Sequence, residues 1–418
     1  MTTGTSPQGL SYAVRRSGRA VAFCALTIGC GTRDEGKYPA GIAHFTEHTL
    51  FRGTKRKSAQ VISGYLDKLG GELNAYTTKE EIVLHATVLK EDWKKAVRLL
   101  LELATEATFP EDEVETERGV VLDEIISYKD NPAEDVYDRF ESLLFEGSPL
   151  SVPILGTCAS VKRITPEMLR RFVAEKFVPS RMVLSVVADI PEAQLEKQLL
   201  RLLPPEATRP PVAYSPPGAK KKADAPVGEH PPVGRSFSTV IDKHNHEVNA
   251  VMGAKAPGLY ETPERLVCAM LSNILGGPAS NSLLNKELRE KRGWVYGIEC
   301  SYTQYADTGI IAISFGCDKA NLEDCKKAIG RILNRLQEKP LSEAQMRAFR
   351  RQLLGQIAIS SEAGEAQCLS MGKSMLAWGS IMTPEQTRAA IEAISAKDLQ
   401  KMARRLFAPD ALSTLIYL

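Results

Sequence analysis

The stretch Ala40-Gly-Ile-Ala-His-Phe-Thr-Glu-His-Thr-Leu-Phe-Arg52 contains the pattern His-x-x-Glu-His at His44, Glu47 and His48. No proline or glycine interrupts it after Gly41, and its apolar residues recur at roughly helical spacing, so it predicts a helix. Residues four apart share a helix face, and His44 and His48 can therefore point at one metal ion. Glu47 projects beside the same place. This order mirrors His-Glu-x-x-His, in which a helix supplies two zinc ligands and a general base.

The rarity of histidine strengthens this interpretation. The chain has 6 His in 418 residues, and two of them flank a glutamate at ligand spacing. The alternative is a pair of half-buried histidines on an amphipathic helix. Because a catalytic zinc typically has three protein ligands and a water, the pattern also leaves one ligand to be found.

An acidic helix, expected from near Pro110 to Lys129, offers the missing carboxylate. Glu117 and Glu124 lie two turns apart and share a face of this helix. One glutamate could bind the metal while the other orients a ligand. A solvated acidic helix explains the same residues, and at this point both interpretations stand.

Length and composition exclude several classes of protein. A chain of 418 residues is too long for one ordinary core and predicts two or more domains. The net charge of +2 indicates neither a nucleic-acid nor an anionic membrane partner. No apolar run approaches the roughly 20 residues of a membrane span. The basic residues 15–19 before the apolar stretch 20–28 imitate a signal peptide, but the stretch fits a buried strand better.

The cysteines are expected to be reduced core residues, because none forms Cys-x-x-Cys and several lie in apolar stretches. Their positions are Cys24, Cys30, Cys158, Cys268, Cys300, Cys317, Cys325 and Cys368. Reduced thiols favour the cytoplasm of a bacterium, while a periplasmic or organellar location stays open.

Apolar periodicity predicts an order of strands and helices in the first half of the chain. Strands are expected at 20–30, 72–78, 81–88 and 182–188, and helices at 40–52, 58–69, 90–104, 110–129, 133–145 and 165–176. The region 204–234 holds nine of the 24 prolines and predicts an extended linker.

After this region, sequence segments of the first half recur in the same order. Residues 91–96 return as 323–328, and the spacing of Ile164, Leu169 and Phe177 returns at 394–407. We therefore predict an α+β protein of two homologous domains, each a largely antiparallel sheet packed with helices: 1–203, a linker at 204–235, and 236–418. The second copy has Leu266-Val-Cys-Ala-Met-Leu271 where the first has its histidines, so it lacks metal ligands.

Taken together, the motifs resemble the M16 zinc peptidases, the pitrilysin-type inverzincins, and especially their half-size branch that includes the mitochondrial processing peptidase β subunit. The resemblance runs from about residue 20 to the C-terminus. It rests on the segments 31–35, 41–48, 70–77 and 117–124, and in the second domain on 275–277 and 288–296.

The resemblance implies roles for individual residues. It implies Zn²⁺ held by His44, His48 and Glu124, with Glu117 as the supporting carboxylate and Glu47 as the general base. It also implies that Asn74 and Ala75 belong to an edge strand that pairs with a peptide substrate.

In the second domain, Arg289 and Tyr296 match an Arg/Tyr pair of the family, suited to a substrate carbonyl and an oxyanion. Without the resemblance, an exposed Arg and a buried Tyr are the simpler interpretations. Since one half-size chain carries both the zinc motif and this pair, the resemblance implies a homodimer in which the pair acts across chains.

The expected function is a zinc endopeptidase for short or unfolded peptides, with no nucleic-acid or membrane partner. The main alternative is a non-catalytic scaffold subunit of the same fold, and a metal-dependent hydrolase of other substrates is a third. The scaffold predicts broken zinc motifs, whereas the motifs here are intact.

Overall fold

The computed structural model describes residues 1–203 and 236–418 and divides into two compact units. The described part of the first unit comprises 1–126, 148–203 and 358–381, and that of the second comprises 127–147, 236–357 and 382–418. Each unit therefore includes a short segment from the other half of the chain. The predicted domain boundaries stay a prediction, and the predicted linker, 204–235, lies outside the described residues.

The first unit contains a six-stranded sheet in the order β1-β2-β6-β3-β5-β4. All neighbouring pairs are antiparallel except β2 and β6. Its strands are β1 (Thr2–Thr5), β2 (Ser11–Arg16), β3 (Val21–Ile28), β4 (Glu72–Thr77), β5 (Ile82–Leu89) and β6 (Met182–Ala188).

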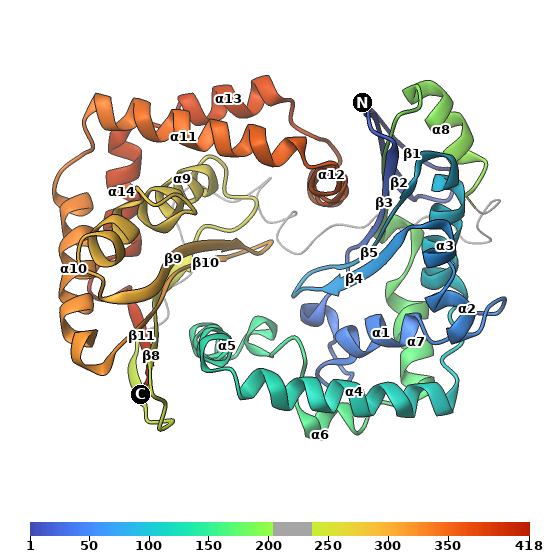
Figure 1. The fold of residues 1–418 in the computed structure, drawn as a ribbon, viewed down its shortest axis with the longest axis horizontal. Helices are drawn as coiled ribbons and strands as arrows, with labels where there is room; N and C mark the ends of the chain where they lie inside the picture. Colours follow the sequence, from blue (N-terminus) through green and yellow to red (C-terminus); the bar gives the residue numbers. More distant parts are fainter. Residues whose placement is uncertain (204–235) are drawn as a thin grey trace. The chain divides into compact units, whose positions relative to one another are not determined.

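The helices of this unit surround the sheet (Figure 1). They are α1 (Ile42–Leu50), α2 (Ala59–Ser63), α3 (Trp93–Glu106), most of α4 (Glu111–Lys129), α6 (Cys158–Val161), α7 (Pro166–Lys176), α8 (Glu192–Leu200) and α12 (Gly364–Trp378). Short 3-10 turns occupy Thr32–Asp34, Asp67–Leu69, Lys90–Asp92, Pro149–Ser151 and Pro179–Arg181.

The second unit contains a five-stranded sheet in the order β7-β11-β8-β10-β9, with one parallel pair, β7 and β11. Its strands are β7 (Ser238–Ile241), β8 (Val248–Ala256), β9 (Val295–Gln304), β10 (Gly309–Cys317) and β11 (Ser413–Tyr417). Its helical segments are α5 (Pro132–Leu144), α9 (Glu264–Gly276), a π-helical segment (Asn285–Glu290), a 3-10 turn (Lys319–Asn321), α10 (Leu322–Glu338), most of α11 (Glu343–Glu362), α13 (Pro384–Glu392) and α14 (Ala396–Leu406).

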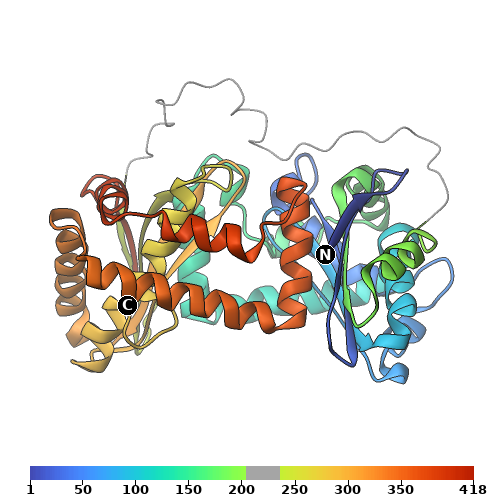
Figure 2. The same ribbon diagram turned by 90° about the horizontal axis from the view of Figure 1, so that it is seen from above.

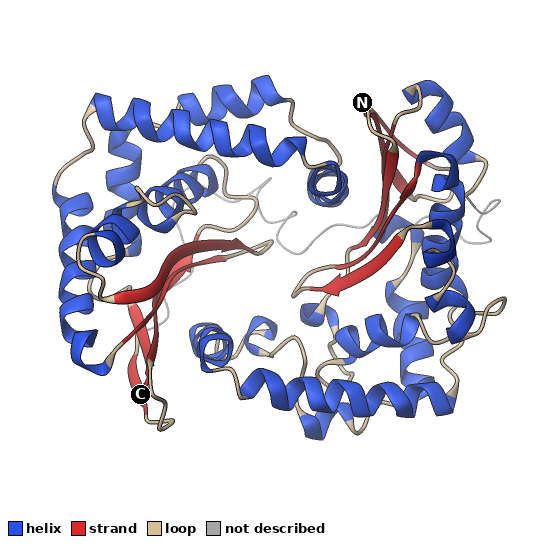
Figure 3. Cartoon of the chain, in the orientation of Figure 1, coloured by secondary structure: helices blue, strands red, loops and turns tan. Residues whose placement is uncertain are grey.

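The two units share one topology, which confirms the predicted duplication and the α+β class. Strand for strand, β2-β6-β3-β5-β4 corresponds to β7-β11-β8-β10-β9, including the single parallel pair. Figure 3 shows strands and packed helices in each unit. The repeated residues 91–96 and 323–328 both begin a helix, α3 and α10, that follows a strand through a 3-10 turn. The second repeat forms α7 before β6 and α14 before β11.

A helix from the distant C-terminal half completes the first unit. Along each strand alternate residues face opposite sides, so Leu26 and Leu84 enter the main core while Ala25 and Val83 face α12. Helix α12 packs on β6, β3 and β2 through Cys368, Met371 and Met375 (Figure 2). In the second unit, α5 from the N-terminal half packs on β8 and β11 in the same manner.

The structure differs from the sequence-based expectation in two respects. The helix predicted at 58–69 is wrong in length: α2 ends at Ser63, because Gly64 begins a turn that leads to a separate 3-10 turn. The strands β1 and β2 and helix α8 were not predicted. The basic residues 15 and 16 lie on β2, and the apolar stretch after them forms the buried strand β3, as expected.

All eight cysteines are unpaired, and all except the half-buried Cys158 are buried, as predicted. Among the described residues, no helix is both long enough and apolar enough to cross a membrane.

Candidate metal centre

Helix α1 presents His44, Glu47 and His48, and its N-terminus is fixed by a buried carboxylate. Glu35 accepts hydrogen bonds from the backbone N–H of Gly41 (3.0 Å) and of Ala43 (3.0 Å). Burial raises the pKa of Glu35 to about 8, against these bonds. Gly41 itself has φ of 88°, and a Cβ there would lie 2.6 Å from the carbonyl oxygen of Leu155. This residue is therefore required to be glycine.

Three side chains converge from two helices. His44 Nε2 lies 3.7 Å and His48 Nε2 lies 3.4 Å from the same oxygen, Oε2 of Glu124 on α4. Tetrahedral zinc with bonds of ~2.0–2.1 Å separates its ligand atoms by about 3.4 Å. Both distances to Glu124 are close to this value, and the three residues offer ligand atoms that all lie within 4.8 Å of one another. Within the described residues, this is the one group of three or more His, Cys, Asp or Glu side chains with such spacing. Of the two glutamates left open by the sequence, Glu124 is the one facing both histidines.

The centre is partly open to solvent. The His44 side chain is 9% exposed, whereas that of Glu124 is 42% exposed. Solvent can therefore reach the site, as a catalytic metal site with a bound water requires, whereas four protein ligands close a structural site.

Glu117 lies on the other side of His48. Its Oε2 is 3.0 Å from His48 Nδ1, and its buried carboxylate also contacts the guanidinium of Arg52. With the proton on Nδ1, His48 donates to Glu117 and leaves Nε2 free for a metal. The carboxylate thus orients the imidazole, and Arg52 compensates its buried charge.

The pKa shifts of the histidines differ because their surroundings differ. Burial, followed by the nearby His48, lowers the pKa of His44 to about 4, so His44 is neutral at physiological pH. Burial acts in the same direction on His48, but the contacts with Glu124 and Glu117 outweigh it and raise the pKa of His48. The hydrogen bond to His48 lowers the pKa of Glu124, which is therefore ionised as a metal ligand must be.

Glu47 points beside these ligands and is held by β4. The hydroxyl of Thr77 donates a hydrogen bond of 2.8 Å to Glu47 Oε2. Burial raises the pKa of the Glu47 carboxyl, and the bond from Thr77 opposes that rise. A carboxylate with a raised pKa is suited to accept and release a proton near neutral pH.

Asn74 and Ala75 lie on β4, which is an edge strand of the first sheet, as predicted. They pair with His85 and Leu84 of β5 on one side. The other edge of β4 is unpaired within the described residues and can accept an extended chain.

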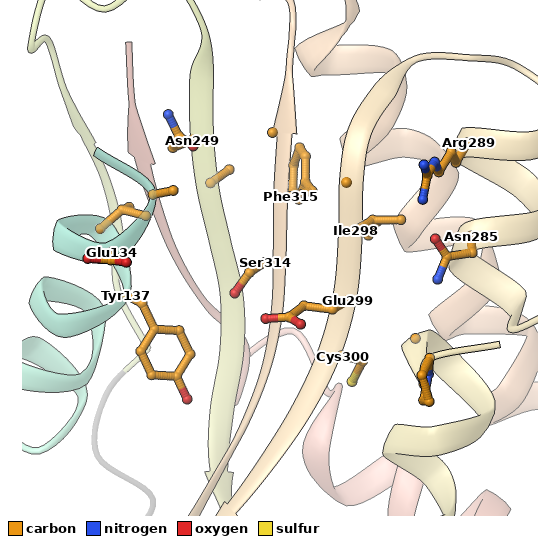
Figure 4. Close-up of a pocket in the computed structure, with 18 of the residues that line it drawn as sticks. Glu134, Tyr137, Asn249, Asn285, Arg289, Ile298, Glu299, Cys300, Ser314 and Phe315 are labelled. Carbon is orange, nitrogen blue, oxygen red and sulfur yellow. The ribbon is translucent and has the colours of Figure 1, made fainter. Parts of the chain in front are cut away.

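Arg289 and Tyr296 belong to the second unit. Arg289 is exposed at the end of the π-helical segment and lines an open pocket of about 820 Å³ with Asn285, Glu299 and Ser314 (Figure 4). Tyr296 is on β9 and is 55% exposed, so the interpretation of a buried tyrosine is wrong. Its hydroxyl donates to Asp318 Oδ1 at 2.7 Å.

Sequence reasoning missed four contributors to the first unit's centre: Glu35, Arg52, Thr77 and Gly41. Arg52 offered a signal, because it follows His48 by one helical turn. Glu35, Gly41 and Thr77 lie inside the segments 31–35, 41–48 and 70–77, but their partners are determined only by the three-dimensional fold.

In the second unit, the segment Leu266–Leu271 lies on α9, the counterpart of α1, and supplies no metal ligand. Fold and donor set together define the class: a two-domain α+β protein in which one unit offers two histidines and a glutamate to a metal ion.

Comparison with known proteins agrees with this class. The family model described as insulinase (peptidase family M16) matches residues 12–158, and that of the peptidase M16 inactive domain matches 163–353. An uncharacterized zinc protease of Streptomyces coelicolor is 30% identical over 377 residues, which are 90% of this chain and 80% of that protein. The uncharacterized zinc protease YmxG of Bacillus subtilis is 29% identical over 402 residues, 95% of this chain and 93% of that protein. The chain belongs to the M16 peptidase family.

Solved structures show the same fold. A protease from Helicobacter pylori superposes with a TM-score of 0.87 at 19% identity and covers 100% of this chain and 99% of its own. A structure from Pseudomonas fluorescens, described as a peptidase M16 inactive domain, gives a TM-score of 0.85 at 19% identity, covering 100% and 97%.

Proposed function

We propose that the protein is a zinc-dependent endopeptidase that hydrolyses short or unfolded peptides. The observation that carries this proposal is the convergence of His44 Nε2 and His48 Nε2 on Glu124 Oε2, beside the buried carboxyl of Glu47. The zinc proteases among its relatives support the choice of metal. Eight unpaired thiols support a reducing compartment such as the bacterial cytoplasm.

The chain's own residues divide the work of hydrolysis. His44, His48 and Glu124 would hold the zinc ion, which when bound would supply an acidified water and polarise the scissile carbonyl. Glu47 takes the proton of the attacking water and then gives it to the leaving amine. Thr77 orients Glu47 through its hydroxyl and favours the ionised form that accepts the proton.

The substrate is proposed to bind as an added strand on β4. Main-chain hydrogen bonds along the edge at Asn74 and Ala75 hold an extended peptide with little demand on its sequence. A folded protein cannot offer such a strand without unfolding, which restricts the substrates to short or unfolded peptides.

Arg289 and Tyr296 are proposed to act on the substrate of a second copy of the chain, in a homodimer. Arg289 binds a substrate carbonyl, and Tyr296 donates to the oxyanion formed at the scissile bond. The exposure of both side chains supports this role, because each can reach a partner chain.

A quenched peptide substrate tests the function. We expect cleavage that 1,10-phenanthroline abolishes and stoichiometric zinc restores. Glu47→Gln should lower kcat by about 10²–10⁴-fold, because it removes the proton acceptor. Zinc content, measured by atomic absorption, should stay unchanged, since Glu47 is not among the ligands.

Two outcomes would count against the proposal. Cleavage that survives chelation, or that Glu47→Gln leaves intact, would exclude this site as the catalyst. If the protein binds zinc but cleaves no peptide in a library of unstructured peptides, the result would instead favour a scaffold subunit of the M16 fold.

A further inference from the structure

Tyr296 occupies a bulge in β9, the edge strand of the second sheet. Gly316 of β10 pairs with Gly297, but the next residue, Cys317, pairs with Val295, so Tyr296 has no partner residue. No other strand pair in the described parts of the chain shows a register shift. Bulges re-aim side chains and are frequent next to functional sites. Tyr296 is 55% exposed at this bulge.

The phenol of Tyr296 is held by a residue 22 positions later. Its hydroxyl donates to Asp318 Oδ1 at 2.7 Å. Asp318 immediately follows β10 and precedes the 3-10 turn Lys319–Asn321, yet its side chain makes no capping hydrogen bond. An aspartate at this position usually caps backbone N–H groups. Here the carboxylate is directed at the phenol instead.

The ring has little else to fix it. It lies beside Gly316, where a Cβ would be 3.9 Å from Tyr296 Cδ2, so the glycine leaves room for the ring. An exposed tyrosine with free χ1 and χ2 samples several orientations, and holding one of them costs entropy. The hydrogen bond to Asp318 offsets this entropic cost before the substrate binds.

The contact with Asp318 also raises the pKa of the phenol. The hydrogen bond to Asp318 is the main reason that the pKa of Tyr296 is raised to about 12, and the negative charge of Glu247 adds to it. A phenol has one proton to donate. Donation to a substrate oxygen therefore moves this hydrogen bond from Asp318 to that oxygen. A charged oxyanion competes with a carboxylate for the proton better than a neutral carbonyl does.

We propose that Asp318 is the positioning residue of Tyr296: it fixes the phenol at the bulge of β9 and releases its hydrogen bond to the oxyanion in the transition state. This inference rests on the proposed function, because Tyr296 meets a substrate only there. Loss of Asp318 should mainly lower kcat, since the interaction it prepares exists in the transition state rather than in the bound ground state.

The test is a double-mutant cycle with the full-length chain and the quenched peptide. Asp318→Ala should lower kcat about three- to tenfold and leave KM nearly unchanged. Asp318→Asn keeps an acceptor oxygen and should recover part of the loss. In a Tyr296→Phe background, Asp318→Ala should have no further effect, because there is no phenol left to position. Asp324→Ala, which removes an exposed charge on α10 without a contact to Tyr296, is the matched control and should behave like the unmodified protein.

Several results would overturn the inference. Additive losses in the Tyr296→Phe background would mean that Asp318 acts on the fold of the 3-10 turn, and a higher kcat for Asp318→Ala would mean that it restrains the phenol. If Glu47→Gln abolishes cleavage but Tyr296→Phe does not affect it, the proposed peptidase function is supported and the role of Asp318 is contradicted. If Glu47→Gln has no effect, the proposed function itself is contradicted. Thermal unfolding of each variant separates these effects from loss of folding.

Discussion

Three side chains in contact with one another lead outward from the candidate metal centre. Arg52 contacts the buried carboxylate of Glu117, which in turn orients His48. A buried carboxylate without a cation is costly, and the contact with Arg52 compensates the charge of Glu117. We therefore expect the zinc affinity of the proposed site to depend also on Glu117 and Arg52, which are not among its three proposed ligands.

Replacing Glu117 by Gln should weaken zinc binding about 10–100-fold, because the amide cannot carry the charge that raises the basicity of His48. Competition with a chromogenic chelator measures this affinity. Glu113→Gln is the matched control: Glu113 is on the same helix, and its carboxylate is 3.9 Å from Arg52. Equal effects of both variants would mean that only the net charge of α4 matters.

Glu47, the proposed general base, is positioned by Thr77. The effect of Thr77 should appear in the pH dependence of activity. Burial raises the pKa of Glu47, and the hydroxyl of Thr77 opposes that rise. Thr77→Val keeps the shape but removes the donor, so the pKa of Glu47 rises further. Only ionised Glu47 accepts a proton, and activity is lost as the pH falls through its pKa. The acid limb of the kcat/KM profile should therefore move to higher pH.

The comparison variant for Thr77→Val is Thr77→Ser, which retains the hydroxyl and should retain the profile. An acid limb that does not move in Thr77→Val would show that another group controls it.

At the scale of the element, the position of α1 depends on the contacts at its N-terminus. Its first turn is held by Glu35, and the chain enters it through Gly41 in a left-handed conformation close to Leu155. The histidines follow within two turns, so an error at the start of α1 displaces both ligands.

Gly41→Ala should destabilise the protein by about 1–3 kcal/mol, from the left-handed backbone and the contact with the Leu155 carbonyl. Urea unfolding measures the loss, and zinc affinity should fall with it. Gly119→Ala should do the opposite: Gly119 is exposed within α4, a Cβ added there would meet no atom within 4 Å, and the change should gain about 0.5–1 kcal/mol from helix propensity. Equal effects at the two glycines would contradict this reasoning.

At the scale of the whole molecule, two copies of one topology have taken different tasks. The first unit has on α1 and α4 the three residues that could hold a metal ion, and α9 of the second unit has no such group among the described residues. The second unit instead carries Arg289 and Tyr296 at exposed positions. That one chain carries both sets of residues is the basis for the proposed homodimer.

Mixing two inactive variants tests this arrangement. Glu47→Gln and Arg289→Ala should restore about a quarter of the activity, because half of randomly formed dimers are mixed and each has one complete site. Glu47→Gln mixed with His44→Ala is the control and should restore nothing, since both changes fall in the same half of the site. No rescue despite confirmed subunit exchange would mean that the pair does not act across chains.

The sequence alone predicted the histidine helix, the acidic helix, the strand at 72–78 and the duplication; the edge position of that strand was implied by the resemblance. The helices and the strand follow from periodicity within one segment, and the duplication follows from segments that recur about 230 residues later. The sequence motifs also carry the family resemblance, which implied Glu124 as the third metal ligand.

The tertiary structure decided which distant groups meet. The sequence left two glutamates of α4 open, and the fold turns Glu124 to both histidines and Glu117 to the far nitrogen of His48. It also brings Thr77 to Glu47, Asp318 to Tyr296, and α12 onto the first sheet. Each of these contacts joins residues many positions apart, so it depends on how the elements pack, and the periodicity of one segment carries no information about that packing.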